Sequence, residues 1–252
     1  MKIRVLGCDG GVLPGFDQVS FLVNDHLVVD AGSICSKLTL KEQHKIKELL
    51  ITHGHLDHVK DIPFLAENRW LSGAQNAMTI FSTDAILTDI KKNLLNGIVW
   101  PDFSKVPSER PIYRLRSIRQ PISLEDLKIE AIPVAHSHSA LGYIISDRKA
   151  AVVFSGDTGP TDELWQIANQ KTNLKAIFLE TSFPSALADL AWRTKHLSVT
   201  SLLREISKIK NKKTPIYLYH LKPMYFKTIR QEIKKSGIPR LHILKRAKTF
   251  KW

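Results

Sequence analysis

Hydrophobic residues in the first part of the chain are spaced as in the strands of a β-sheet. Residues 2–5 alternate charged and apolar side chains, and short apolar runs follow at 20–23 and 26–30. Alternation with a period of two is typical of a strand that buries one face, so this part predicts a hairpin-rich sheet. The segment 47–53 is largely apolar and predicts a buried strand whose end carries histidine.

Three segments have apolar residues at helical spacing. The segment 83–97 predicts a helix that Thr83 or Asp84 can cap. A second apolar stripe runs from residue 199 to residue 209, and a last helix is expected at about 225–235.

The remaining apolar runs predict strands. They lie at 113–117, 127–134, 142–146, 150–155, 175–181 and 214–220. The order of strands, one helix, more strands and then strands alternating with helices favours an α/β fold with two sheets and outer helices over one doubly wound parallel sheet. No tract resembles a linker, so we expect a single domain over residues 1–252.

The stretch ITHGHLDHVKD concentrates the residue types that bind metals. It contains His53, His55, Asp57 and His58. Imidazole and carboxylate groups bind divalent metals such as Zn²⁺, and three or four of them must converge on each ion. In a loop that leaves a strand, His53 and His55 can project to one side while Asp57 and His58 begin the next turn. The stretch therefore predicts two pairs of ligands for two neighbouring ions.

Each ion needs at least one more ligand, and later strand ends supply candidates. His136, Asp157 and His220 each follow or end a predicted strand. A carboxylate between two cations can bridge them, which suits Asp157. His138 competes with His136, and we favour His136 because it directly follows its strand, whereas His138 fits an exposed loop or a role in orienting a ligand.

The H-x-H-x-D-H run, followed by a later histidine, an aspartate and a last histidine, resembles the signature of the metallo-β-lactamase superfamily of hydrolases. The resemblance extends over essentially the whole chain. It implies an αββα sandwich, with two mixed sheets, helices on the outer faces and a dinuclear metal site at one edge. The metal is usually zinc, with manganese or iron as alternatives. By this resemblance one ion is held by His53, His55 and His136, the other by Asp57, His58 and His220, and Asp157 touches both.

Further motifs are similar to those of the class II cyclic-nucleotide phosphodiesterases. They are, in order, VLGCDGG, SFLV, VVDAGS, SGDTGPTDELW, LETSFP, KHLS and YHLKP. This resemblance implies hydrolysis of cAMP or cGMP to the 5′-monophosphate, by attack of a hydroxide that the two metal ions activate. Two departures concern substrate preference. Lys195 stands where glycine is common, and Lys60-Asp61-Ile62 stands where a Gly-Leu pair is usual.

Several residues are candidates for catalysis or substrate binding beyond metal ligation. Asp57 can orient the attacking water as well as bind metal. His196 can donate a hydrogen bond to the phosphate or protonate the departing 3′ oxygen, and the alternative is a role in orienting a ligand or starting a helix. Thr158 and Ser182 are candidate phosphate contacts, with a simple turn position as the alternative.

The net charge of the chain indicates what kind of molecule it binds. The chain has 37 Lys and Arg against 24 Asp and Glu, a formal net charge of +13. This excess favours a small anionic substrate and leaves nucleic acid open as a partner, although a solvated basic face or tail explains it as well. Much of it lies at 208–213 and in the ending 244–252, the one part where disorder is expected.

The sequence also indicates a location. No apolar run approaches the roughly 20 residues that span a bilayer, and the start is not signal-like, so we expect a soluble cytoplasmic protein without a membrane partner. Cys8 and Cys35 are expected to be reduced thiols. A homodimer remains open.

Other functions are compatible with the same ligands. A tRNA 3′-end endonuclease (tRNase Z) shares them, but generally has a long tRNA-binding arm between the third histidine and the bridging aspartate, where this chain is short. Another RNA or DNA phosphodiesterase, a thioesterase or a lactonase remains an alternative. A non-catalytic nucleic-acid-binding protein is disfavoured, because a structural metal site needs no bridging aspartate.

Overall fold

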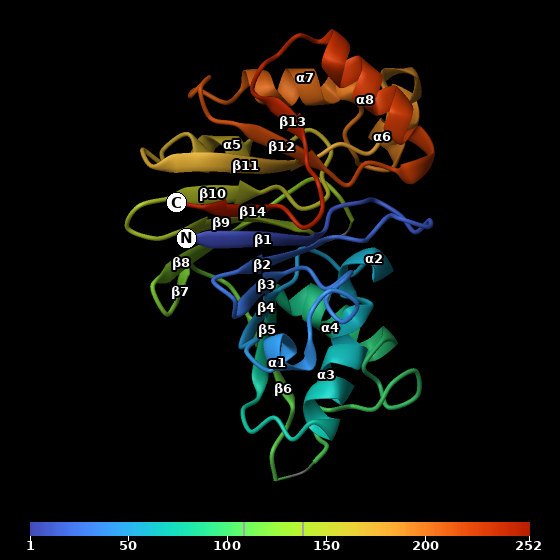
Figure 1. The fold of residues 1–252 in the computed structure, drawn as a ribbon, viewed down its shortest axis with the longest axis vertical. Coiled ribbons are helices and arrows are strands. Elements are labelled where there is room, and N and C mark those ends of the chain that lie inside the picture. Colours follow the sequence, from blue (N-terminus) through green and yellow to red (C-terminus); the bar gives the residue numbers. More distant parts are fainter. Residues whose placement is uncertain (108, 138) are drawn as a thin grey trace.

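In a computed structural model, which describes residues 1–107, 109–137 and 139–252, two β-sheets pack face to face between two layers of helices. Figure 1 shows the sheets across the middle of the molecule and helices above and below them. The α/β fold predicted from the sequence, an αββα sandwich of two mixed sheets, is confirmed.

The first sheet has seven strands in the described part of the chain. Its strands from β14 to β3 are antiparallel neighbours, and those from β3 to β6 are parallel. In order across the sheet they are β14 (Thr249–Lys251), β1 (Lys2–Gly7), β2 (Ser20–Val23), β3 (Leu27–Val29), β4 (Glu48–Leu50), β5 (Met78–Ser82) and β6 (Tyr113–Ser117).

The second sheet also has seven strands among the described residues. Strands β13 to β10 are parallel neighbours and β10 to β7 are antiparallel. In order they are β13 (Leu241–Ile243), β12 (Ile216–Tyr219), β11 (Leu174–Glu180), β10 (Ala151–Phe154), β9 (Leu141–Ser146), β8 (Leu127–Pro133) and β7 (Ile122–Leu124).

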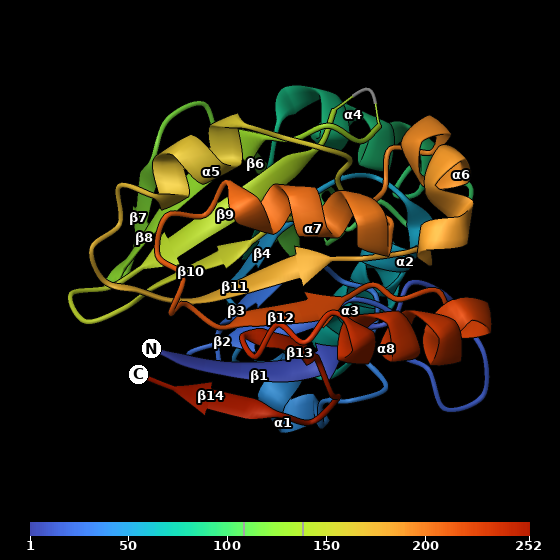
Figure 2. The ribbon, with the colours of Figure 1, turned by 90° about the horizontal axis from the view of Figure 1, so that it is seen from above.

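Helices cover the outer face of each sheet (Figures 1 and 2). On the first sheet lie α1 (Leu40–Gln43), α3 (Asp61–Leu71) and α4 (Asp84–Asn93). On the second sheet lie α5 (Glu163–Ala168), α7 (Val199–Ser207) and α8 (Phe226–Lys235). Short helices lie in the connections from strands to the helices that follow: α2 (Leu56–Val59), η1 (Ser185–Leu187), α6 (Ala188–Arg193) and η2 (Pro223–Tyr225).

Aromatic rings join the two sheets. The ring of Phe21 on β2 lies 5.0 Å from that of Phe154 on β10 and 5.2 Å from that of Phe178 on β11. Phe154 and Phe178 are themselves stacked at 4.8 Å. Such contacts add to the large apolar area that buried aromatic side chains remove from water. They fix the two sheets against each other, and with them the strand ends that carry the candidate ligands.

Two predicted boundaries are wrong. The helix expected over 83–97 begins at its Thr83 cap but ends at Asn93, because the chain turns there to bury Leu95 completely. The strand expected over 47–53 ends at Leu50. The backbone N–H of Thr52 bonds to the Asp30 carboxylate instead of a neighbouring strand, so Thr52 and His53 lie in a loop.

The expectation of a disordered basic ending is also wrong. Strand β14 pairs with β1, and Phe250 packs its ring 5.4 Å from that of Phe178. Residues 249, 250 and 251 alternate exposed, buried and exposed, so the lysine faces solvent while the ring joins the core. The N-terminal amine donates to the carbonyl of Trp252 at 2.8 Å, which brings the chain ends together (Figure 1).

Cys8 and Cys35 are free thiols, as expected. No helix in the described part of the chain combines the length and the apolar content that a membrane crossing requires.

Candidate metal centre

The candidate ligands lie where strands of both sheets end. His53 follows β4 of the first sheet, whereas His136, Asp157 and His220 follow β8, β10 and β12 of the second. The carboxyl ends of β4, β10 and β12 therefore point to one edge of the sandwich, a common place for sites in α/β folds. His138, the competitor of His136, lies outside the described residues.

The carboxylate of Asp157 lies at the middle of this group. Its Oδ2 atom is 3.1 Å from Nε2 of His220 and 3.4 Å from Nε2 of His58. The same oxygen is 3.7 Å from Nε2 of His53 and 4.0 Å from Nε2 of His136. Two atoms bonded tetrahedrally to one ion at about 2.0–2.1 Å lie about 3.3 Å apart. The distances to His220 and His58 are close to that spacing, and those to His53 and His136 are longer.

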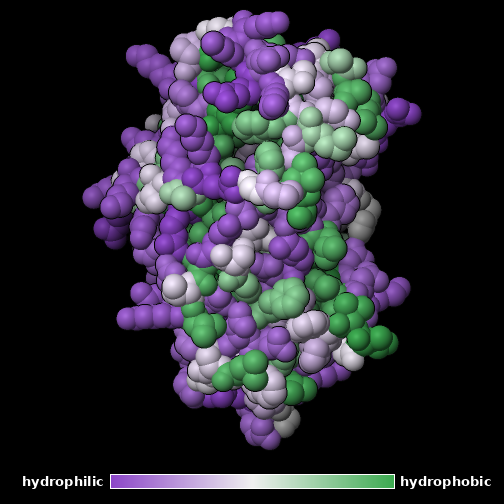
Figure 3. All heavy atoms as spheres, turned by 45° about the vertical axis from the view of Figure 1, so that its right-hand side comes forward, coloured by the Kyte–Doolittle hydropathy of each residue, from purple (hydrophilic) through white to green (hydrophobic). Residues whose placement is uncertain are grey.

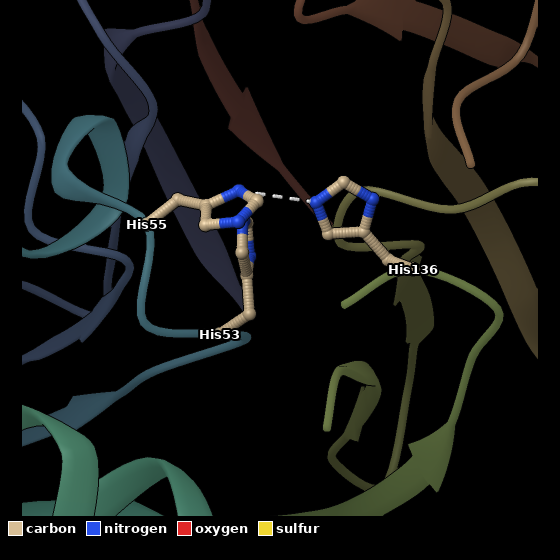
Figure 4. A group of neighbouring side chains, drawn as sticks. All are labelled: His53, His55 and His136. Carbon is tan, nitrogen blue, oxygen red and sulfur yellow. Dashed lines mark hydrogen bonds between the residues drawn. The ribbon is translucent and has the colours of Figure 1, made fainter. Parts of the chain in front are cut away.

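The first group of candidate ligands consists of three histidines, His53, His55 and His136. Their nearest nitrogens all lie within 4.8 Å of one another. Figure 4 shows the rings of His55 and His136 facing each other, with His55 Nδ1 3.2 Å from His136 Nε2. His55 is exposed, so this group opens to solvent on one side.

The second group is Asp57, His58 and His220, and its ligand atoms also lie within 4.8 Å of one another. Oδ2 of Asp57 is 3.3 Å from Nε2 of His220 and 3.9 Å from Nε2 of His58. Helix α2 carries Asp57 and His58 on successive residues, and the ring of His58 lies 4.2 Å from that of His53, so the two groups adjoin each other. The structure therefore brings together all seven residues that the sequence analysis proposed as ligands.

Unpartnered buried atoms indicate what this group is built to hold. Nε2 of His53, Nε2 of His58 and Oδ1 of Asp157 are buried and have no hydrogen-bond partner among the described residues. Leaving a buried polar atom unpaired costs about 1–3 kcal/mol. These atoms converge at the spacing of metal ligands, and a bound cation would offset the cost by accepting their lone pairs. The residues therefore fit a metal.

Hydrogen bonds behind the histidines set which ring nitrogen faces the centre. His58 Nδ1 donates to Asp30 at 2.8 Å, and Thr52 Oγ1 also donates to Asp30. Since the Thr52 hydroxyl proton is used there, its oxygen accepts from His53 Nδ1 at 3.0 Å. When each ring is neutral, this arrangement leaves the lone pair on Nε2, facing the centre, as in metal-binding histidines. Asp30 was missed by the sequence analysis, although it ends the apolar run at 26–30.

A second buried carboxylate, Glu180 at the end of β11, organises the other side. His196 Nδ1 donates to Glu180 Oε1 at 2.9 Å. Ser182 donates to Glu180 Oε2 at 3.1 Å and therefore accepts from His220 Nδ1 at 2.8 Å. Glu180 thus fixes His196 directly and His220 through a hydroxyl. Glu180 was also missed from the sequence, where it could have been noticed as a charged residue at the end of an apolar strand.

Residues 25–220 match the family model described as the beta-lactamase superfamily domain. The chain belongs to this superfamily. It is 24% identical over 250 residues to the 3′,5′-cyclic-nucleotide phosphodiesterase of Aliivibrio fischeri, an alignment that covers 80% of this chain and 73% of that protein.

Solved structures of the superfamily share the fold. Unliganded yeast PDE1 superposes with a TM-score of 0.81 at 17% identity, over 98% of both chains. The short form of human tRNase Z superposes with a TM-score of 0.72 at 15% identity, over 100% of this chain and 99% of that one. At these identities the likeness shows the fold alone. Together with the superfamily match and the histidine and aspartate cluster, it makes the chain a metallo-β-lactamase-fold hydrolase.

Close backbone contacts hold two histidines of this hydrolase in place. His136 Nδ1 donates to the carbonyl of Lys195 at 2.9 Å, and Lys195 has a positive φ of 53°. A Cβ atom on Gly10 would lie 2.4 Å from the carbonyl oxygen of His220 and 2.8 Å from its Nδ1. The glycine is therefore required by close approach to His220.

Thr158 and Ser182, the predicted phosphate contacts, are fully buried in the hydrolase. Thr158 donates its hydroxyl hydrogen to the carbonyl of Gly159, and Ser182 bonds to Glu180 and His220 as described above. The structure does not bring either hydroxyl to the surface of the site. His196 keeps 8% of its surface exposed.

The electrostatics of the centre are dominated by burial and by Asp157. Burial lowers the pKa of His53, His55 and His136, with the neighbouring histidine charges adding to the effect at His53. At His58 burial acts in the same direction but is outweighed by Asp157 and Asp30, which raise its pKa well above its usual value. The rings of the first group are thus neutral and ready to bind a cation.

The two carboxylates of the centre are held ionised. Burial disfavours charge on Asp157, but His220 and His58 outweigh it and hold its pKa well below the usual value. Burial also disfavours charge on Asp57, but His220 and His58 outweigh it and lower the pKa of Asp57. At His196, burial is outweighed by Glu180 and Asp157, which raise its pKa.

Three exposed apolar side chains are close in the sequence to residues of the site. Leu56 is 64% exposed, Met224 81% and Trp192 69%. Each lies within four positions of a candidate ligand or of His196. Figure 3 shows one face of the molecule, on which apolar side chains are interspersed among polar ones.

Proposed function

We propose that the hydrolase converts a 3′,5′-cyclic nucleotide, cAMP or cGMP, to the 5′-monophosphate. The observation that carries the proposal is the position of Asp157 Oδ2 between two groups of ligand atoms, 3.1 Å from His220 Nε2 and 3.7 Å from His53 Nε2. A shared carboxylate suits two ions close together, the arrangement used for in-line displacement at phosphorus. The phosphodiesterase named among the relatives, the motif order and the net charge of +13 support the same substrate class.

In this proposal His53, His55 and His136 hold one divalent cation and Asp57, His58 and His220 hold the other, with Asp157 shared. Zinc suits this donor set best, and manganese or iron are the alternatives. When bound, two such cations lower the pKa of a water toward neutrality and neutralise phosphate charge.

The side chains around that centre complete the reaction. The partly exposed carboxylate of Asp57 accepts a hydrogen bond from the attacking water and orients it. Water adds to phosphorus and gives up a proton to solvent while the bond from phosphorus to the 3′ oxygen breaks, and the 3′ oxygen takes up a proton. His196, whose Nδ1 is fixed by Glu180, presents its other nitrogen to the phosphate or to the departing oxygen. A positioned acid of this kind accelerates such a step typically by about 10²- to 10⁴-fold.

The segment between His136 and Asp157 favours a small substrate over transfer RNA. Its described residues form β9 and β10 within the second sheet, and none of them forms a separate arm. A large RNA would therefore have to be bound by other surfaces.

A substrate panel tests the proposal. Purified protein, loaded with zinc or manganese, is incubated with cAMP, cGMP, bis(p-nitrophenyl) phosphate, a short RNA and a thioester. We expect hydrolysis of a cyclic nucleotide and of the simple diester. Cleavage of RNA without cyclic-nucleotide cleavage would assign the site to a nuclease, and cleavage of the thioester alone would make the phosphodiesterase assignment wrong.

A further inference from the structure

A cavity of about 540 Å³ opens beside His196, between α6 and α7. Pro160, Trp192, Ser198 and Arg204 are among the residues that line it together with His196. Its size falls within the roughly 300–1,000 Å³ of small-molecule sites. Since His196 also lies 3.9 Å from Asp157 through its Nδ1, this side chain stands between the metal centre and the cavity.

Trp192 is the large apolar side chain of this region. It also lines a second cavity of about 400 Å³, together with Ala135, Gly159 and Pro160. Ala135 directly precedes the candidate ligand His136, and Gly159 lies two positions after Asp157. Trp192 therefore lines two hollows, one that His196 also lines and one whose lining residues neighbour candidate ligands in the sequence, while 69% of its surface remains exposed. A single exposed aromatic is unremarkable, but one at this place is available to a bound molecule.

The backbone that carries the indole is fixed relative to the centre. The backbone N–H of Lys195 bonds to the carbonyl of Trp192 at 3.1 Å, and that of His196 bonds to the carbonyl of Ala191 at 2.8 Å. The next carbonyl, that of Lys195, accepts from His136 Nδ1. One short segment thus holds the Trp192 backbone, a candidate ligand and His196, so a ligand that spans them meets a preformed surface.

The chemistry of the lining fits a nucleobase. Every base has a π face that stacks on indole, and a purine offers the larger area. Arg204 on α7 adds a guanidinium, which matches the acceptor atoms on the edge of a purine. Pro160 supplies an apolar wall to both hollows.

Building on the proposed phosphodiesterase function, we propose that Trp192 is the base-stacking residue of the substrate site. The phosphate occupies the metal centre beside His196, and the purine base lies against the indole. The residue determines preference for a nucleoside cyclic phosphate over a diester without a base, and for purines over pyrimidines.

The test uses three variants. Trp192→Ala removes the stacking surface, Trp192→Phe keeps a smaller aromatic face, and Ile98→Ala alters an apolar side chain that is 90% exposed and outside the described cavities. Hydrolysis of cGMP, cAMP, cCMP and 1-O-methylribose 3′,5′-cyclic phosphate is measured at several concentrations. Binding of 5′-GMP is followed separately by quenching of tryptophan fluorescence.

For Trp192→Ala we expect KM for cAMP and cGMP to rise by about 5- to 150-fold, the range of one lost base stack, with kcat changed little. Trp192→Phe should lie between it and the wild type, Ile98→Ala should equal the wild type, and the substrate without a base should be unaffected by every variant. Quenching by 5′-GMP should be largely lost in Trp192→Phe, because the quenched indole is gone.

Unchanged KM for purine substrates in Trp192→Ala, or full quenching in Trp192→Phe, would overturn this assignment while leaving the phosphodiesterase function intact. A wild-type protein that hydrolyses no cyclic nucleotide would overturn the proposed function instead. In that event the quenching measurement alone decides whether Trp192 receives a base.

Discussion

The carboxylate of Asp30 lies directly behind His58, with its Oδ2 2.8 Å from the ring Nδ1, and both side chains are almost fully buried. Asp30 has a positive φ of 57°, an uncommon backbone conformation for a residue other than glycine. The bonds from His58 and from Thr52 hold it there. Asp30 thus orients one ligand directly and a second, His53, through Thr52.

Replacing this carboxylate should weaken metal binding without removing a ligand. For Asp30→Asn we expect the affinity for zinc to fall about 10- to 100-fold, the usual effect of losing a partner that orients a ligand. Competition with a chromophoric chelator measures it. Asp25→Asn, at an exposed carboxylate paired with Lys2, is the matched control and should bind zinc as the wild type does. An unchanged affinity in Asp30→Asn would show that His58 is oriented by other groups.

His196→Ala should lower turnover and spare the metal. If His196 protonates the departing 3′ oxygen, kcat for cAMP falls about 10²- to 10⁴-fold while metal content stays that of the wild type. The loss should be much smaller for bis(p-nitrophenyl) phosphate, since p-nitrophenolate leaves without protonation. Equal losses on both substrates would mean that His196 binds the phosphate and does not act as an acid.

Gly10→Ala should displace His220. The new Cβ would be 2.4 Å from the His220 carbonyl oxygen, a distance at which backbone must move. We expect the second ion to be lost or weakly held, with the first group of ligands intact. Gly54→Ala serves as the control, because a Cβ there meets no atom within 4 Å although Gly54 lies between His53 and His55. Full metal content in Gly10→Ala would contradict the proposed role of His220.

Metal binding should release protons. In the metal-free protein, burial opposes charge on His58 but Asp157 and Asp30 outweigh it and raise its pKa, so this ring carries a proton that a cation must displace. The apparent affinity therefore rises with pH until the folded pKa of His58 is passed and falls as the pH is lowered. Calorimetry in two buffers of different ionisation enthalpy gives the number of protons released. Binding heats that do not depend on the buffer would refute the displacement.

The sequence predicted the outline of the fold and the composition of the centre for different physical reasons. The strands of both sheets have continuous or alternating apolar patterns, which identify them in the sequence. Histidine and aspartate residues that can bind metal stand just after several of these strands. The H-x-H-x-D-H spacing placed four of those ligands close together, and the structure brings the other three, His136, Asp157 and His220, to the same edge.

What was missed depends on long-range contacts. Strand β14 was hidden by Lys248 just before it and Lys251 within it, since only its pairing with β1 and the burial of Phe250 against Phe178 make it a strand. Helix α3 was also missed. It buries a charged residue, Arg69, whose guanidinium donates to the carbonyls of Gln43, His44 and Ile46 more than twenty residues earlier in the chain. The roles of Asp30 and Glu180 likewise appear only when strand ends from distant segments meet.

The proposed chemistry depends on two metal ions that share Asp157. The most direct measurement is metal content per chain, by elemental analysis of the protein after saturation with zinc and removal of the excess, for the wild type and for Asp157→Ala. We expect two ions in the wild type and a loss of at least one in the variant. A wild-type chain that retains no ion, or a variant that still retains two, would contradict it.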